Sequence, residues 1–445
     1  MKTKISKEQL FTRLANSEDA RACKGIDDAA CKVVSGNYVT LLLSQVLSQF
    51  ADALLNPKVT LPWLLHALNV PSAFIAWLVP IRESGSLLPQ LAIADYVRSL
   101  PIRKWVWVFG ALVQALSIFA MVLVGLTLDG NLDGNLDGNL EGNLAGFAII
   151  ALLVIFSLAR GFNSVAAKDV LGKTIPKKQR GGVSGYAASA AGFATITFGL
   201  GLWYFQRHGD KASVLIALGA GALMWVLAAL VYAKIDEYPG ATEGGKNGLL
   251  HALGKLRLLI DDKPFAHFVL TRALLLCSAL SAPFYIVLAS EQGFNFSLLA
   301  VFLALSGFAS LISGPFWGHL SDRSSKQVLV FASILVSVNG LLVYLVATNL
   351  PSLLASTFFL PGMYLILTIA HQGVRLGRKT YLVDMADGNK RTDYVAVSNT
   401  VIGVCLLVLG SLGFLGNWLN NAELILIYSL MGIAGALSAI LLPRQ

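Results

Sequence analysis

The segment GPFWGHLSDRSSKQ, residues 314–327, overlaps the ends of two long apolar runs, at about 297–319 and 327–347. Each run is close to the length that an α-helix needs to cross the roughly 30 Å hydrocarbon core of a bilayer, about 20 residues. Backbone groups inside lipid have to be hydrogen-bonded within their own segment, which favours helices. The stretch therefore predicts two membrane-spanning helices joined by a short charged turn.

Apolar runs of similar length continue in both directions along the chain. In the first half they fall near residues 37–57, 71–94, 104–127, 145–162, 183–205 and 211–233, and in the second half near 264–289, 352–374, 394–415 and 422–442. With the two runs above they predict twelve spans. The composition agrees, because 56% of the 445 residues are apolar and only 13% are charged, whereas soluble domains carry about 25% charged residues.

The runs predict an all-α polytopic membrane protein built of two six-helix bundles. The predicted domains are a cytoplasmic N-terminal segment at 1–36, a bundle at 37–233, a cytoplasmic central loop at 234–263 and a second bundle at 264–445. The net charge of +9 does not point to nucleic acid in such a chain, and the lipid bilayer is the expected partner.

The positions of Lys and Arg predict which side of the membrane holds the termini, because cytoplasmic loops retain basic residues. With the N-terminus inside, 29 of the 34 Lys and Arg residues lie in inner segments. The outer loops hold Lys58, Arg207 and Lys211, and two more, Arg82 and Arg272, lie within spans. We therefore expect a multi-pass protein of the cell (inner) membrane with both termini in the cytoplasm.

A long-range repeat relates the two halves. KDVLGKTIPKKQRGGVSG runs from Lys168 to Gly185, and RKTYLVDMADGNKRTDYVAVSN runs from Arg378 to Asn399. Aligning them on their basic residues places Lys168 against Lys379, an offset of 211 residues, and both stretches join the fourth span of a half to the fifth. A duplicated six-helix unit explains this, and transporters are often built of such repeats with the substrate site between them.

The segment 314–327 carries a short motif, G-x-L-x-D-R, formed by Gly318, Leu320, Asp322 and Arg323. Together with the twelve spans and the duplicated unit, it resembles the signature loop of the major facilitator superfamily. The equivalent loop of the first half, LAIADYVRSLPIRK, has Leu91 where the glycine would stand. The resemblance identifies no subfamily.

The resemblance implies a fold of two pseudo-symmetric six-helix bundles that rock about a central site by alternating access. It also implies a latch that closes the cytoplasmic side between the halves. The residues it assigns to this cytoplasmic gate are Asp95, Arg98, Arg103, Gly318, Asp322 and Arg323. The basic stretches 168–180 and 378–391 would support that closure or would only retain the positive-inside bias.

Four ionisable residues lie inside predicted spans, where a charge costs several kcal/mol unless function or pairing compensates. They are Asp52 in the first span, Arg82 and Glu83 in the second and Arg272 in the seventh. We expect Asp52 and Arg272 to face each other across the central cavity. Asp52 or Glu83 would carry a proton, and Arg82 or Arg272 would meet an anionic part of the substrate; the alternative is structural pairing between neighbouring helices.

Three further expectations concern local roles. Arg375 ends the tenth span at the inner face, where snorkelling to the interface is favoured over substrate binding. Small residues of the fifth span, Gly185, Ala188 and Gly192, suit close helix packing. All four cysteines are expected to be free thiols.

The preferred function is a secondary active transporter that moves a small organic solute, anionic or zwitterionic, with proton coupling. A passive facilitator or a transporter-like receptor is the alternative, and a membrane-embedded enzyme is less favoured. The six histidines lack metal-ligand spacing and no phosphate-binding G-x-x-x-x-G-K-[ST] loop occurs, so we expect no catalytic residue, metal or cofactor. The expected state is a monomer.

Overall fold

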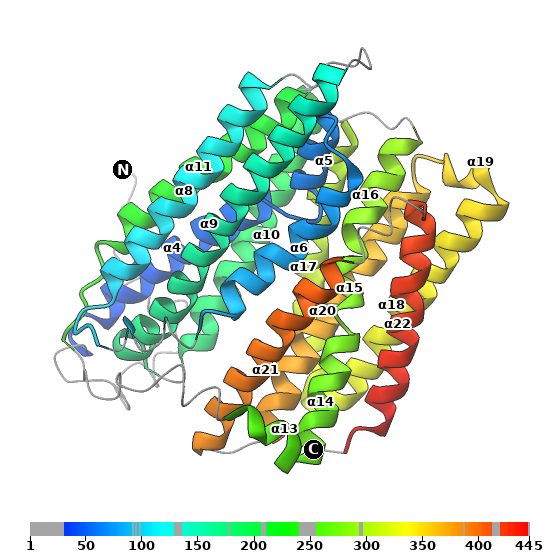
Figure 1. Cartoon of the computed structure of the whole chain (residues 1–445). Helices are drawn as coiled ribbons and strands as arrows, with labels where there is room; N and C mark the ends of the chain where they lie inside the picture. Colours follow the sequence, from blue (N-terminus) through cyan, green and yellow to red (C-terminus); the bar gives the residue numbers. More distant parts are fainter. Residues whose placement is uncertain are drawn as a thin grey trace, which may run out of the picture.

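Figure 1 shows the computed structural model of the chain, in which long helices run alongside one another between two ends. The structure describes residues 31–443 except 91–92, 94–95, 98, 129–135, 177–178, 206–210, 240–254, 293–296, 386–387 and 412–418. In this part the chain makes twelve passes and forms no strand. The prediction of an all-helical protein with twelve spans is confirmed.

Each half of the chain supplies six passes. The first six are formed by α4 (Val34–Leu54) with α5 (Thr60–Ala67), α6 (Ser72–Leu87), α8 (Lys104–Thr127), α9 (Leu136–Thr174), α10 (Arg180–Phe205) and α11 (Lys211–Tyr232). The second six are formed by α14 (Lys263–Leu274) with α15 (Cys277–Leu280) and α16 (Ala282–Glu291), then α17 (Ser297–Arg323), α18 (Ser325–Asn349), α20 (Phe359–Met385), α21 (Gly388–Gly410) and α22 (Asn421–Leu441). Three short helices, η2 (Lys255–Arg257), α13 (Leu258–Asp261) and α19 (Pro351–Leu354), lie in connections.

The passes differ in polarity. Eight of them contain helices that are long and apolar enough to cross a membrane by length and composition, counting only the described residues. The other four run through α4–α5, α6, α20 and α21, which are shorter or more polar. Large apolar side chains such as Phe109, Leu116 and Phe193 are exposed on the bundle surface, as expected where a protein meets lipid.

The first pass is broken in its middle. Helix α4 ends at Leu54 and α5 begins at Thr60, with Pro57, which has no backbone N–H to donate, between them. The side-chain oxygen of Asn56 accepts a hydrogen bond from the backbone N–H of Lys58 at 2.9 Å. The predicted span of 37–57 is therefore too short, and Lys58 lies within the pass and not in an outer loop.

The seventh pass is also broken. Helix α14 gives way to α15 at Leu275 and Leu276, and α16 follows after Ser281 with Pro283 in its first turn. Each broken pass is the first of its six-helix unit, as a duplicated unit predicts.

The two repeated basic stretches, predicted as loops, are largely helical. Helix α9 continues to Thr174 and α20 continues to Met385. The guanidinium of Arg180 donates hydrogen bonds to the carbonyls of Ile175 at 2.8 Å and Gly172 at 2.7 Å. These bonds satisfy carbonyl groups that the end of a helix leaves free.

One cysteine differs from its predicted state, and a tetrapeptide repeat overlaps the start of α9. Cys31 is disulfide-bonded, so the prediction of four free thiols is wrong, although Cys277 and Cys405 are free. The tetrapeptide repeat DGNLDGNLDGNLEGNL, residues 129–144, has the composition of a linker, yet α9 already begins at Leu136.

The two halves touch along two pairs of helices, α10 with α17 and α6 with α21. We call the end of the bundle that holds Val34 and Leu441 the terminal end and the opposite end the far end; the terminal end is at the bottom of Figure 1. A Cβ on Gly307 of α17 would lie 2.8 Å from the carbonyl oxygen of Gly192 on α10, and one on Gly199 would lie 2.8 Å from that of Ala300. Glycine is therefore required at these close approaches.

The same helices separate toward the terminal end. A Cβ on Gly185 of α10, or on Gly314 or Gly318 of α17, would meet nothing within 4 Å. The packing role predicted for Gly192 is confirmed, whereas Gly185 has no close neighbour and Ala188 is exposed. Along α10 and α17 the halves are thus in contact at the far end and apart at the terminal end.

Candidate functional site

Four charged side chains of the first half form one network. Arg82 Nη2 lies 3.2 Å from Asp52 Oδ1, and Arg82 Nη1 lies 2.9 Å from Glu83 Oε1. Arg160 Nη2 lies 3.6 Å from Asp52 Oδ2, and Arg160 Nη1 lies 3.7 Å from Glu83 Oε1. Each carboxylate therefore faces two guanidinium groups. We call these four residues the ion-pair network.

Three passes bring the ion-pair network together. Asp52 lies near the end of α4, Arg82 and Glu83 are consecutive in α6, and Arg160 lies on α9. The Arg82 side chain is 9% exposed, and the other three are 26–33% exposed. Consecutive helical residues point about 100° apart. The Arg82 guanidinium nevertheless contacts the Glu83 carboxylate, so both residues belong to the same network.

Arg160 was not among the predicted site residues. A span ending near residue 162 assigns it to the membrane interface, but α9 runs on to Thr174. Its guanidinium therefore meets Asp52 and Glu83 within the bundle. One signal in the sequence could have identified it, because the repeat offset of 211 places Arg160 opposite His371, an ionisable residue inside the tenth span.

Lys58 joins the same region from the break in the first pass. Its largest electrostatic interaction with a charged side chain is with Glu83, and smaller ones are with Arg375, Arg82 and Arg378. Among the described residues no carboxylate lies close enough to the Lys58 ammonium to form an ion pair. The unwound segment between α4 and α5 therefore places an unpaired cation beside the ion-pair network.

Helix α20 of the second half contributes two more cations. Arg375 interacts electrostatically with Glu83 and Arg82 of the first half, and Arg378 interacts with Arg375 and Glu83. Arg375 is exposed and Arg378 is half-buried, and neither forms an ion pair or a side-chain hydrogen bond within the described part of the chain. Helix α20 continues ten residues beyond Arg375 to Met385, so Arg375 does not end the tenth pass as predicted.

Together these side chains form a site that crosses the boundary between the halves. We call it the charged cluster; its members are Asp52, Lys58, Arg82, Glu83, Arg160, Arg375 and Arg378. It holds five cations and two carboxylates, which leaves three more positive than negative charges. Charges at this depth are costly in a membrane protein and mark substrate or ion pathways.

Arg272, the fourth predicted site residue, belongs to a separate polar centre. Its guanidinium donates hydrogen bonds to Ser398 Oγ and, at 2.9 Å, to Asn399 Oδ1 on α21. Asn399 Nδ2 in turn donates to Gln90 Oε1 at 3.2 Å, which crosses from the second half to the first. Asp52 forms its ion pairs with Arg82 and Arg160, so the structure gives Asp52 and Arg272 separate partners, and their position across a central cavity remains a prediction. Arg378 is the charged neighbour of Arg272.

The predicted cytoplasmic gate is described only in part. Asp95 and Arg98 lie outside the described residues, as does the side chain of Asp322. Gly318 has open space around it, and Arg323 is exposed at the end of α17. The latch between the halves therefore remains a prediction.

Arg103, the remaining gate residue, is bound within the first half. Its guanidinium lies 3.1 Å from Asp169 on α9, and its backbone N–H donates to the buried Glu237 carboxylate. Glu237 also accepts from the backbone N–H of Lys104 at 2.6 Å and from Lys173 Nζ at 2.9 Å. A carboxylate at the start of a helix satisfies free N–H groups and stabilises the helix dipole, so this contact fixes α8 to α9.

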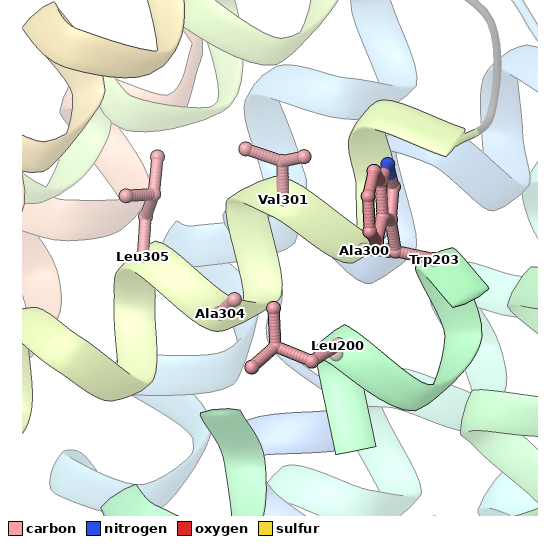
Figure 2. A pocket seen from close by; sticks show the side chains of 7 residues that line it. Leu200, Trp203, Ala300, Val301, Ala304 and Leu305 are labelled. Atoms are coloured by element: carbon pink, nitrogen blue, oxygen red, sulfur yellow. The ribbon is translucent and has the colours of Figure 1, made fainter. Parts of the chain in front are cut away.

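Away from the charged cluster, an apolar groove of about 300 Å³ lies between α10 and α17 toward the far end. Figure 2 shows Leu200 of α10 beside Ala304 of α17 and Trp203 beside Ala300. It holds no charged or hydrogen-bonding side chain except the indole of Trp203, so it offers nothing to orient a polar solute. Within the described residues no three His, Cys, Asp or Glu side chains are grouped as metal ligands would be.

Comparisons with known proteins agree with this architecture. Similar solved structures include a D-xylose-proton symporter at 14% identity, with a TM-score of 0.69 over 91% of this chain and 97% of that one. The inward-open xylose transporter XylE from E. coli is 13% identical, with a TM-score of 0.65 over 93% and 97%. A bacterial homologue of the iron transporter ferroportin, in an inward-facing state, is 17% identical, with a TM-score of 0.66 over 91% and 98%.

Identities this low establish the fold and not the substrate. No curated protein sequence matches the chain. A family model described as the Major Facilitator Superfamily matches residues 41–409, most of the length of the protein. The chain therefore belongs to the Major Facilitator Superfamily.

Proposed function

We propose that the chain is a secondary active transporter that moves a small organic solute by alternating access and couples its movement to protons. The observation that carries this proposal is the charged cluster, to which both halves contribute side chains. A site shared by two bundles changes shape when they rock against each other, which couples binding to the exposure of one side or the other. The excess of cations favours a solute with an anionic part.

The glycine contacts between α10 and α17 support alternating access. They close the far end, and the same helices are apart at the terminal end, as in a state open to one side. A Gly307→Ala variant places a Cβ 2.8 Å from a backbone oxygen, and overpacking of this kind costs about 1–3 kcal/mol. The far-end contact should weaken.

Spin labels at the far ends of α10 and α17 measure this change. We expect Gly307→Ala to shift the label distances toward longer values and to slow solute flux. Gly185→Ala is the matched control, because its Cβ meets nothing within 4 Å, and it should change neither quantity. Equal distances in both variants would contradict the assignment of α10 and α17 to the moving seam.

Proton coupling is proposed for Asp52 or Glu83. Both carboxylates are partly exposed and paired with Arg82 and Arg160, and Glu83 also interacts with Arg375 of the second half. Movement of the second half would therefore change the surroundings of Glu83. A proton carried with an anion also offsets the cost of moving negative charge through a membrane potential, about 2.3 kcal/mol per charge per 100 mV.

Flux into proteoliposomes tests the coupling. We expect a proton gradient to drive accumulation of a labelled solute by the unaltered protein and Asp52→Asn to abolish that accumulation while the protein still folds. If flux does not respond to the gradient in either protein, a passive facilitator replaces the secondary active transporter; if no solute moves at all, a transporter-like receptor does.

The distribution of charge supports a proposal for the location of the protein, its orientation in the membrane and its cytoplasmic gate. The protein would lie in the cell (inner) membrane with its termini in the cytoplasm, because Lys and Arg are concentrated in the segments on that side. Asp95, Arg98, Arg103, Asp322 and Arg323 would then close the cytoplasmic side. Lys168 of α9 and Lys379 of α20, matched by the repeat, interact electrostatically across this end, so closure there has to overcome repulsion.

A further inference from the structure

We propose that the transported solute carries at least two negative charges and that Lys58, Arg375 and Arg378 are the residues that bind them. This inference rests on the proposed transport function and deepens it by naming the class of substrate, a multivalent organic anion. It also assigns the role to residues of both halves, one from the broken first pass and two from α20.

The ion-pair network supplies no charge to neutralise these three residues. Arg82 and Arg160 together balance Asp52 and Glu83, and the four lie within ion-pair distance of one another. Lys58 and Arg375 both interact electrostatically with Glu83, but Glu83 is already held by two guanidinium groups at 2.9 Å and 3.7 Å. Three positive charges therefore remain without a negative partner.

These cations are accessible, which distinguishes a binding site from a buried structural contact. Arg375 is exposed, and Lys58 and Arg378 are half-buried, although all three lie within passes of the bundle. In the described part of the chain their side chains donate no hydrogen bond to a protein acceptor. Five donors on each guanidinium and three on the ammonium are thus available to oxyanion oxygens.

Neutralisation sets the charge of the solute. Lys58 and Arg375 interact across the boundary of the halves as like charges, so each opposes the approach of the other half. A monovalent anion would leave two of the three charges uncompensated, whereas a divalent or trivalent anion removes most of the repulsion. Arginine favours phosphate and carboxylate groups because its planar fork binds two oxygens at once.

The same arrangement explains how binding would be coupled to movement. Lys58 is attached to the break of the first pass, and Arg375 and Arg378 are attached to α20 of the other half. An anion held between them joins the halves, and without it the like charges keep them apart. Closure around an empty site is then disfavoured, which prevents movement without solute.

Thermal stabilisation of the purified, full-length protein tests the inference without requiring transport. The probes are citrate, succinate and glucose 6-phosphate, with acetate, chloride and glucose at equal ionic strength as comparisons. We expect at least one multivalent anion to raise the apparent melting temperature in a saturable manner and the monovalent and neutral probes to leave it unchanged. Equal stabilisation by acetate, chloride or glucose would overturn the proposal.

Variants assign the binding to the named residues. Lys58→Met and Arg375→Met should each raise the half-saturation concentration of the stabilising anion by about tenfold to a hundredfold, the range for loss of one charged hydrogen-bonding partner. Arg257→Ala removes the same charge from an exposed residue outside the bundle and should leave the half-saturation concentration unchanged. Lys58→Arg keeps the charge and should bind, so a folding defect of Lys58→Met is distinguishable from loss of a ligand.

Flux measurements separate this inference from the proposed function. If multivalent anions bind and the variants weaken them but no solute moves across proteoliposomes, the anion site stands and the transport function fails. If a neutral or monovalent solute is transported and no multivalent anion binds, the transport function stands and the anion site fails. Binding that is unchanged in Lys58→Met and Arg375→Met refutes the assignment of these two residues.

Discussion

Asp52 and Arg272, one in each half, both lie close to a break in a pass but are held in opposite ways. Asp52 lies three residues before the break of the first pass at Leu55, and Arg272 lies three residues before the break of the seventh pass at Leu275. Asp52 is paired with two arginines, whereas Arg272 is held by a hydroxyl and an amide and has no carboxylate within ion-pair distance among the described residues. Neighbouring arginines balance the charge of Asp52, and no carboxylate among the described residues balances that of Arg272.

The repeat relates a second pair of contacts. The offset of 211 places Arg160 of α9 opposite His371 of α20. Arg160 contacts Asp52 on the first pass, and His371 Nδ1 lies 2.9 Å from Ser278 Oγ on the seventh. The duplicated fold therefore preserves the contact between these passes while its chemistry changes from an ion pair to a neutral hydrogen bond. This difference predicts that charge removal has opposite effects on stability in the two halves.

The largest effect is expected in the first half, for Arg82→Met. This variant leaves Asp52 and Glu83 to share Arg160 alone, and removing one partner of a buried ion pair leaves an uncompensated charge. Because both carboxylates are partly exposed, we expect a loss of about 2–3 kcal/mol, below the usual range for fully buried pairs. Thermal unfolding in detergent should show a clearly lower apparent melting temperature.

A second substitution checks the cause of that loss. Asp52→Asn combined with Arg82→Met removes one charge of each sign, so the double variant should recover part of the melting temperature. Two independent losses that simply add would show that Arg82 acts through packing and not through its charge.

The fold was largely predictable from the sequence, because length and hydropathy specify how many helices cross a bilayer. The same signals also found Asp52, Arg82 and Glu83, whose charges interrupt apolar runs. They do not specify where a pass ends or which way a side chain turns about the helix axis. Lys58 and Arg375 were therefore assigned to an outer loop and to the interface.

The contacts of Arg272 could not be predicted for a different reason. Its neutral partners, Ser398 and Asn399, are ordinary residues of an eleventh span in the sequence. Only the packing of α14 against α21 brings them to the guanidinium. Symmetry between the first and seventh spans related Arg272 to Asp52 and did not identify these neutral partners.

An effect of opposite sign is expected for Arg272→Met in the second half. Arg272 is 9% exposed, its Nε atom has no hydrogen-bond partner, and Arg378 is its charged neighbour. A buried charge without a counter-charge lowers stability, so its replacement by an apolar side chain of similar length should be neutral or stabilising by about 1 kcal/mol. The apparent melting temperature should therefore stay the same or rise.

The same variant should lose solute flux if Arg272 is retained for transport. Arg272→Lys keeps the charge but not the two-pronged hydrogen bonding, so partial flux in that variant would show that charge contributes separately from geometry. A melting temperature that falls as far as that of Arg82→Met would remove the distinction between the two halves.

The smallest effect is expected for Ser278→Ala, which removes the neutral contact of His371 with the seventh pass. A neutral hydrogen bond contributes about 0.5–1.5 kcal/mol, and His371 keeps its place on α20, so stability should fall by less than in Arg82→Met. Flux should change less than twofold, because neither residue carries a charge that the solute has to displace. Loss of flux in Ser278→Ala with an unchanged melting temperature would instead mean that the contact of Ser278 with His371 takes part in transport. The second half would then hold a functional contact that corresponds to Arg160 and Asp52 in the first half.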